Sequence, residues 1–284
     1  MRMPPGMRPI HSAGAVRRLP GCGNPRHDPF CMSATVRIGT AGWSIPKPVA
    51  ASFPGDGSQL ARYSRVLACA EINTTFTGTH RPATFERWAN DTPPDFRFSV
   101  KLPQAMTHGA RVKVRRAEVK AFTASLGGLG DRLAALLVQL PPSLDLDTRA
   151  ARAFFRSIHA GFEGAVLCEP RHPSWFTAAA ERLLIEERVG RVAADPAKPA
   201  GAGAPGGWLG EAGDGRGATV YYRWHGSPRM YWSRYEDDWL DARAKEISRW
   251  PTGTEVWCVF DNTASGAAAD DALRLRSLLD RGRG

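Results

Sequence analysis

Eight short apolar segments recur along the chain, and each one ends in polar or charged residues. The segments are rich in Val, Ile, Leu and aromatic side chains, which is typical of strands that are buried on both faces. They predict strands at 36–42, 68–76, 96–102, 133–140, 165–169, 191–195, 219–225 and 255–261.

Most of these segments are followed by residues whose apolar positions repeat with the period of a helix. We expect helices at 59–66, 83–90, 117–126, 148–160, 237–249 and 267–280. A further helix is expected to start near Pro173, with Ser174 as its N-cap. Residues 196–218 are rich in Gly, Ala and Pro and predict a long loop. Strand followed by helix, repeated along the chain, predicts an α/β protein built as a single (β/α)8 TIM-type barrel.

The first 33 residues differ from the rest, because they are rich in Pro and Gly and have no periodic apolar pattern. We therefore expect a disordered N-terminal extension over 1–33 and the barrel domain over 34–284. Met32 lies just before the first predicted strand, so we hypothesise that it is the true start and that 1–31 is a mis-called extension. The sequence has neither the apolar core of a signal peptide nor an apolar run of the roughly 20 residues that a membrane span needs.

Composition adds two expectations. The five cysteines are scattered and form no CxxC pair, which favours a cytoplasmic chain over a disulfide framework or a structural zinc site. The formal net charge of +10 is compatible with nucleic acid or with small anionic molecules as partners. A codon bias towards Ala, Arg, Gly and Pro would also explain it.

The polar residues that end the predicted strands are the candidate site. In a parallel barrel the carboxyl ends of the strands meet at one mouth, where active sites lie. Alternate residues of a strand share a face, so Glu71, Asn73 and Thr75 are expected to point the same way. The same parity relates Ser99 to Lys101, Glu169 to Arg171, and Arg223 to His225. We expect all of these side chains to point into the mouth, near Gln139, Asp195, Asp261 and Asn262.

Glu169 and His225 are the candidate catalytic acid and base, because both residue types exchange protons in enzymes. Arg171 lies two residues after Glu169, and a guanidinium beside a carboxylate suits the binding of an anion. A structural ion pair that closes the mouth is the alternative. A hydrogen-bonded structural histidine is the alternative for His225.

Three further residues extend the expected binding site. Lys101 is expected to bind an anion, with a Schiff base or an ion pair to Glu71 or Glu169 as alternatives. Trp43 could stack on a planar group of the substrate. Arg223 is expected to hold the anion together with Lys101 and Arg171. Aromatic residues of the segment 226–235 could form a lid over the mouth.

No cofactor is predicted, and a divalent metal is the alternative. Carboxylates and a histidine on successive strands could bind one, as in barrel isomerases and hydrolases. The candidate ligands are Glu71, Glu169, Asp195, His225 and Asp261. The positive charge of Lys101, Arg171 and Arg223 at the same mouth disfavours this alternative, and no HxH or HExxH spacing occurs.

Seven stretches, in order and spanning about 36–280, resemble the YecE-like family, also described as domain of unknown function seventy-two. They are IGTAGWS (38–44), AEINTTF (70–76), PPDFRFSVKLPQAMTH (93–108), LLVQLPPSL (136–144), CEPRHPSWF (168–176), YYRWHGSPRMYWSRY (221–235) and FDNTASGAA (260–268). The resemblance implies a TIM-type barrel and a site at its mouth, and it implies no particular reaction.

Taken together, the sequence predicts an enzyme that acts on a small anionic substrate, phosphorylated or carboxylated, by acid–base chemistry at the barrel mouth. Glu71, Asn73, Trp43, Asp261 and Asn262 are expected to line its binding site. The first alternative is a hydrolase or isomerase that depends on a divalent metal. The second is a non-catalytic protein that binds nucleic acid.

Overall fold

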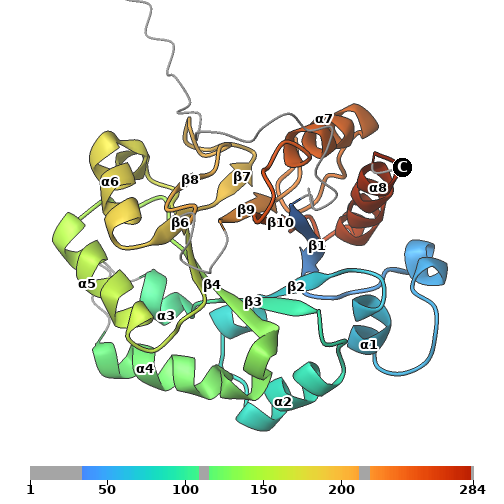
Figure 1. The fold of residues 1–284 in the computed structure, drawn as a ribbon, viewed down its shortest axis with the longest axis horizontal. Helices are drawn as coiled ribbons and strands as arrows, with labels where there is room; N and C mark the ends of the chain where they lie inside the picture. The colour runs from blue at the N-terminus through green and yellow to red at the C-terminus, as the bar shows by residue number, and fades with distance from the viewer. Residues whose placement is uncertain (1–33, 109–114, 211–217, 283–284) are drawn as a thin grey trace, which may run out of the picture. The chain divides into compact units, whose positions relative to one another are not determined.

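The structure is a computed structural model, and it describes residues 34–108, 115–210 and 218–282. These residues form an α/β barrel of mostly parallel strands (Figure 1). The strands are β1 (Thr35–Ala41), β2 (Cys69–Ile72), β3 (Arg97–Lys101), β4 (Leu133–Gln139), β5 (Ala165–Glu169), β6 (Val189–Arg191), β7 (Ala193–Asp195), β8 (Gly206–Gly207), β9 (Thr219–Trp224) and β10 (Glu255–Phe260). The expectations for residues 1–33 lie outside the described residues.

The barrel closes through its sixth strand, which changes partner part of the way along. β6 pairs in parallel with β5, whereas β7 pairs in parallel with β9. Val192 lies between the two segments, and its N–H donates to the carbonyl oxygen of Cys168 at 2.9 Å. The single strand predicted at 191–195 is therefore wrong in its bounds, since the strand starts at Val189 and splits where it leaves β5 for β9. β8 covers the edge of β6 by antiparallel pairing.

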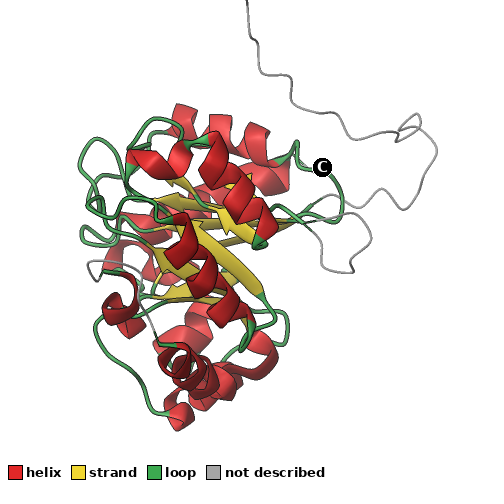
Figure 2. Ribbon diagram, turned by 90° about the vertical axis from the view of Figure 1, so that its left-hand side faces the viewer, coloured by secondary structure: helices red, strands yellow, loops and turns green. Residues whose placement is uncertain are grey.

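Helices surround the strands on the outside (Figures 1 and 2). They are α1 (Gln59–Ser64), α2 (Pro82–Asn90), the short α3 (Gln104–Thr107), α4 (Arg116–Ser125), α5 (Thr148–His159), α6 (Ala178–Glu186), α7 (Asp237–Ile247) and α8 (Ala267–Arg281). Within the described residues, no helix lies between β7 and β9, so the ring of helices is interrupted between α6 and α7 (Figure 1). No helix in the described part of the chain is long and apolar enough to cross a bilayer.

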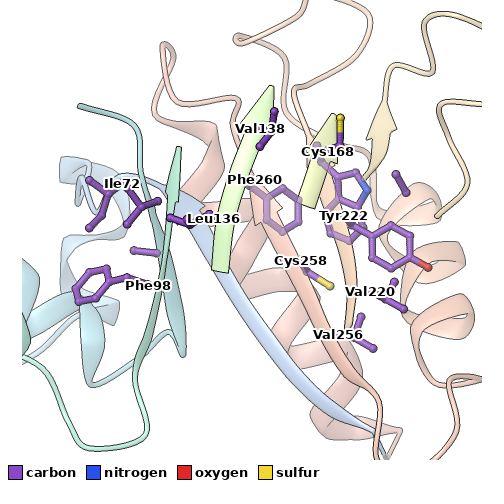
Figure 3. Close-up of a cluster of buried hydrophobic side chains, with 14 of the residues drawn as sticks. Ile72, Phe98, Leu136, Val138, Cys168, Val220, Tyr222, Val256, Cys258 and Phe260 are labelled. Atoms are coloured by element: carbon purple, nitrogen blue, oxygen red, sulfur yellow. The ribbon is translucent and has the colours of Figure 1, made fainter. Parts of the chain in front are cut away.

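Two apolar layers flank the strands. The helix-facing layer includes Ile72, Phe98, Val138, Tyr222 and Phe260, which point from the strands towards the helices (Figure 3). The inner layer is smaller and includes Leu137, Leu167, Tyr221, Trp257 and Val259. The predicted parity is confirmed, because Phe98, Val100, Tyr222 and Trp224 belong to the helix-facing core.

The inner face of each strand changes character towards its carboxyl end. Residues two positions further along than the inner apolar layer are polar or charged: Glu71 after Cys69, Gln139 after Leu137, Glu169 after Leu167, Arg223 after Tyr221, and Asp261 after Val259. Because this offset is the same on five strands, the charged residues form a second layer above the apolar one.

Two other predictions of local structure need correction. The strand predicted at 68–76 ends at Ile72, and Thr74–Phe76 form a 3₁₀ turn, so Asn73 and Thr75 do not continue the alternation of the strand. The side chain of Thr75 turns back and donates to the carbonyl oxygens of Ile72 and Lys101. Helix α6 is capped by Thr177, which accepts from Ala180, whereas Ser174 lies in a preceding 3₁₀ turn.

Candidate functional site

Arg223 occupies the centre of the charged layer and has no solvent exposure. Its Nε and Nη2 donate to Glu71 of β2, with Nε to Oε2 at 2.8 Å and Nη2 to Oε1 at 2.6 Å. Nη1 donates to Oε2 of Glu169 at 2.9 Å, and Nη2 also donates to Oδ2 of Asp261 at 2.9 Å. One guanidinium from β9 therefore joins carboxylates from β2, from β5 and from the residue that follows β10.

This pairing is what allows four charged groups to lie inside the barrel. Burial alone would raise the pKa of Glu169, but Arg223 and His225 more than offset it and hold that pKa well below its usual range. The pKa of Asp261 is lowered in the same way, with Arg223 and then His225 overcoming the effect of burial. Burial would lower the pKa of Arg223, and the surrounding carboxylates raise it well above its usual value. Glu169, Asp261 and Arg223 are therefore ionised at neutral pH.

His225 lies between two of these carboxylates. Its Nδ1 is 3.1 Å from Oδ2 of Asp261, and its Nε2 is 3.2 Å from Oε1 of Glu169. A neutral imidazole has only one N–H, so the two carboxylates favour the doubly protonated ring. Burial would lower the pKa of His225, but Glu169 and Asp261 raise it above its usual value. The imidazolium is thus the form that this arrangement stabilises.

Arg171 lies at the outer side of the same cluster. Its Nε and Nη2 donate to Oε1 of Glu169 at 2.9 and 2.8 Å, and Nη2 also reaches the hydroxyl of Tyr231 at 3.2 Å. The ring of Tyr231 meets His225 edge to face, with 5.4 Å between ring centroids. Tyr231 has a left-handed backbone, with φ of 64°, a conformation that is unusual for a residue with a side chain. It brings an aromatic ring of the segment 226–235 over the charged layer.

Lys101 is nearly buried at the end of β3, yet it has no counter-ion. Its Nζ lies 4.0 Å from the ring centroid of Phe76 and makes no hydrogen bond or ion pair within the described residues. The structure therefore does not contain the alternative that was considered, an ion pair of Lys101 with Glu71 or Glu169. Burial, and secondarily Arg223, lower the pKa of Lys101. The ring face of Phe76 favours the cation.

Tyr221 and Phe76 belong to the site but were not found from the sequence pattern, whereas Ser99 was expected to point into the mouth. Tyr221 and Ser99 lie directly beneath Glu71, where the Tyr221 hydroxyl donates to Oε2 at 3.0 Å and lies 2.7 Å from the Ser99 oxygen. Phe76 was also missed, although it is the last residue of the AEINTTF stretch. The inward parity of Ser99 and Tyr221 was available in the sequence, whereas the contact between Phe76 and Lys101 depends on the 3₁₀ turn that follows β2.

Four predicted site residues lie outside the charged network. Trp43 packs edge to face against Trp88 and Phe98, in contact with the helix-facing core. Asn262 donates to the carbonyl oxygen of Ser233 and to Asp271 of α8, which fastens the segment 226–235. Asp195 accepts from the hydroxyl of Tyr235 at 2.8 Å. Asn73 starts the 3₁₀ turn, and its buried Oδ1 has no hydrogen-bond partner within the described residues.

The proposed metal ligands do not form a separate ligand set. Glu71, Glu169 and Asp261 each accept from Arg223, and Asp195 faces Tyr235. No three His, Cys, Asp or Glu side chains in the described ranges are arranged so that they could hold a metal ion. The donor set of the mouth is rich in cationic groups, which suits an anionic ligand.

A nearly closed barrel of mostly parallel strands, with helices outside and charged residues at the carboxyl ends of its strands, defines a protein of the TIM-barrel class. Comparison with known proteins then gives the family. The family model described as "Protein of unknown function DUF72" matches residues 37–284, and the chain belongs to this family.

Two curated relatives have similar sequences. The UPF0759 protein YecE of Escherichia coli strain K12 is 31% identical over 166 residues, which is 56% of this chain and 59% of the relative. The match therefore spans about three fifths of that relative's length. The UPF0759 protein YunF of Bacillus subtilis strain 168 is 23% identical over 86% of this chain and 95% of its own length.

Solved structures share the fold. A DUF72 family protein of Enterococcus faecalis V583 superposes with a TM-score of 0.70 at 19% identity, over 87% of this chain and 96% of its own. A DUF72 family protein of Thermotoga maritima gives a TM-score of 0.65 at 23% identity, over 87% and 99% of the two chains. A methyltransferase from Methanosarcina mazei has a TM-score of 0.52 at 9% identity, over 90% and 96%, which is a likeness of fold alone.

Proposed function

We propose that this protein is an enzyme that acts on a small anionic substrate, phosphorylated or carboxylated, by acid–base chemistry at the mouth of its barrel. The observation that carries the proposal is Lys101, a nearly buried cation without a counter-ion among the described residues. An unpaired buried charge is unfavourable, so the presence of Lys101 beside six other charged groups is best explained by a ligand of opposite charge.

The balance of charge at the mouth supports an anion. Arg223, Arg171, Lys101 and the His225 imidazolium are cationic, and they face the carboxylates Glu71, Glu169 and Asp261. The carboxylates are neutralised by Arg223, Arg171 and His225, which leaves the charge of Lys101 in excess. Arg171 also keeps its Nη1 free of hydrogen bonds to described residues, so it can donate to a ligand oxygen.

The same geometry suggests the acid and the base. His225 carries a proton on each nitrogen when charged, and these face Asp261 and Glu169. It can donate one of them to a substrate oxygen that replaces one of these carboxylates as its partner. Glu169, the other predicted catalytic residue, has both oxygens engaged, by Arg171, His225 and Arg223. Its proposed role is to orient the ring of His225 and to stabilise its protonated form. Oδ1 of Asp261 accepts no hydrogen bond from described residues, which makes it the better base.

A thermal-shift screen against phosphorylated and carboxylated metabolites tests this proposal. A ligand at one hundred times its Kd stabilises the folded protein by about 2.7 kcal/mol. Lys101→Met should weaken such a ligand about tenfold to a hundredfold, because a hydrogen bond to a charged group contributes roughly 1.5–3 kcal/mol. The melting temperature of the unliganded variant should fall little, because the lost cation has no counter-ion among the described residues and contacts only the ring of Phe76.

The control is Lys120→Met, which removes an exposed lysine of α4 and should leave both ligand binding and melting temperature unchanged. A screen in which no anion binds better to the wild type than to Lys101→Met would overturn the proposal. Once a ligand is found, its turnover should be followed by NMR in the wild type and in His225→Gln. Binding without turnover in the wild type would refute the enzymatic part.

A further inference from the structure

Phe76 brings two basic side chains together at the mouth. Lys101 lies over the face of its ring, and His108 contacts the same ring edge to face with 5.0 Å between centroids. The three residues come from different places: the 3₁₀ turn after β2, the end of β3, and the C-cap of α3. The pairing of Lys101 with His108 is therefore a product of the fold.

Each basic residue here has a nitrogen that is not engaged. In the described part of the chain, Nζ of Lys101 and Nη1 of Arg171 make no hydrogen bond. Nδ1 of His108 lies 2.8 Å from Oγ1 of Thr107, while its Nε2 has no partner among described residues. Three unused nitrogens thus belong to residues at or after the carboxyl ends of β3 and β5, and the charges of both Lys101 and Arg171 act on His108.

Thr107 also indicates which nitrogen of His108 carries the proton. Both contacts of its hydroxyl are satisfied when it donates to the carbonyl oxygen of Pro103 at 3.3 Å and accepts from Nδ1 of His108 at 2.8 Å. A hydroxyl has one proton to donate, and Nδ1 is therefore the protonated nitrogen of the neutral ring. Nε2 has no proton until the ring becomes charged.

We propose that Lys101, His108 and Arg171 form the subsite for a phosphate monoester dianion, and that binding places a proton on Nε2 of His108. This inference rests on the proposed function and names the anionic group of its substrate. The dianion would accept from all three residues, and the proton taken up would turn Nε2 into a charged donor.

The charges around His108 explain why the ligand should be a dianion. Burial, and then the charges of Lys101 and Arg171, lower the pKa of His108, so the free protein holds it neutral at pH 7.5. Burial, and then the positive charge of Arg223, lower the pKa of Lys101. The negative charges of Glu71, Asp261 and Glu169 raise it. A carboxylate would be balanced by the excess charge of Lys101 alone. A second negative charge favours protonation of His108, the neutral base that shares the Phe76 ring with Lys101.

Isothermal titration calorimetry with methyl phosphate and with acetate tests the inference. Methyl phosphate is mostly dianionic at pH 7.5, since its second pKa is about 6. Titrations in two buffers of different ionisation enthalpy give the number of protons taken up. We expect methyl phosphate to bind with uptake of about one proton and acetate to bind with none.

His108→Gln is the decisive variant, and His80→Gln is its control, because His80 contacts Phe85 and Trp88 instead of Phe76. His108→Gln should abolish the proton uptake, weaken the binding of methyl phosphate about tenfold and leave the binding of acetate unchanged. His80→Gln should behave as the wild type.

Unaltered proton uptake in His108→Gln would overturn the inference. A second outcome is that acetate binds in a way that depends on Lys101 while methyl phosphate does not bind. This would overturn the inference and leave the proposed function unaffected. Binding of neither anion, with no hit in the metabolite screen, would overturn both.

Discussion

At the scale of single residues, His225 shows how neighbours set a protonation state. Its two nitrogens face Asp261 and Glu169 at 3.1 and 3.2 Å. Both carboxylates are ionised because Arg223 lowers their pKa against the effect of burial. The ring therefore titrates above its usual pKa, and its charge depends on residues from two other strands.

This arrangement predicts how stability depends on pH. A histidine whose folded-state pKa is raised contributes stability that is complete below the unfolded pKa of about 6.5. That contribution is lost as the pH rises through the higher folded-state pKa. The gap in unfolding free energy between the wild type and His225→Gln should therefore be larger at pH 6 than at pH 9. Urea denaturation at both values measures it, with His80→Gln as the control. A gap that grows towards pH 9 would contradict a raised pKa.

At the scale of elements, the segment between β9 and α7 carries the aromatic cover of the site. Gly226 starts it with φ of 92°, and an added Cβ would lie 2.6 Å from the carbonyl oxygen of Ser233. The N–H of Gly226 donates to the Tyr235 hydroxyl, and Asn262 fastens Ser233. These contacts hold the backbone that places Tyr231 over His225 and Arg171.

Gly226→Ala should accordingly disturb this segment. Both the positive φ and the close approach of Ser233 oppose a side chain, and a conformation of this kind costs about 1–3 kcal/mol. Denaturant unfolding should show a loss of that size, together with weaker binding of any anionic ligand, because Tyr231 would shift from Arg171. Gly78→Ala is the matched control, since an added Cβ there meets nothing within 4 Å and its φ is not positive. Equal stability of the two variants would show that the segment adapts freely.

At the scale of the whole molecule, Arg223 links strands that are far apart in sequence. From β9, its guanidinium bonds to β2, to β5 and to the residue that follows β10. These contacts cross the inside of the barrel, whereas hydrogen bonds of the sheet join only neighbouring strands. The charged layer is thus a structural part of the barrel as well as the candidate site.

Arg223→Met should therefore cost about 3–5 kcal/mol of unfolding free energy, because Glu71, Glu169 and Asp261 would remain buried without their partner. Urea denaturation measures the loss, and Arg249→Met, an exposed position after α7, should change stability by less than about 0.5 kcal/mol. A loss below about 1 kcal/mol for Arg223→Met would mean that the carboxylates are neutralised in some other way.

The local pattern of residues was enough to predict the barrel and most of its inner face. Apolar segments of strand length alternate with helical ones, and the strand period of two residues places Glu71, Lys101, Glu169 and Arg223 on the same side as the inner core. The strands occur where the pattern predicted them, with shifted ends, because burial on both faces requires apolar residues wherever a strand runs. The exception is β8, which lies in the predicted loop 196–218. The family assignment followed from seven short stretches and is confirmed by the family model.

Only the tertiary structure decided which side chains and which strands became partners. By sequence, Glu71, Glu169 and an anionic ligand were all possible partners of Lys101. In the structure Arg223 pairs with the two carboxylates, and Lys101 lies over the ring of Phe76. Trp43 turns to Trp88, and the sixth strand splits between β5 and β9. Such outcomes depend on distances between residues that are remote in sequence. A local pattern determines which face a side chain occupies, whereas competition among charges for the same partner is settled only when the strands are assembled.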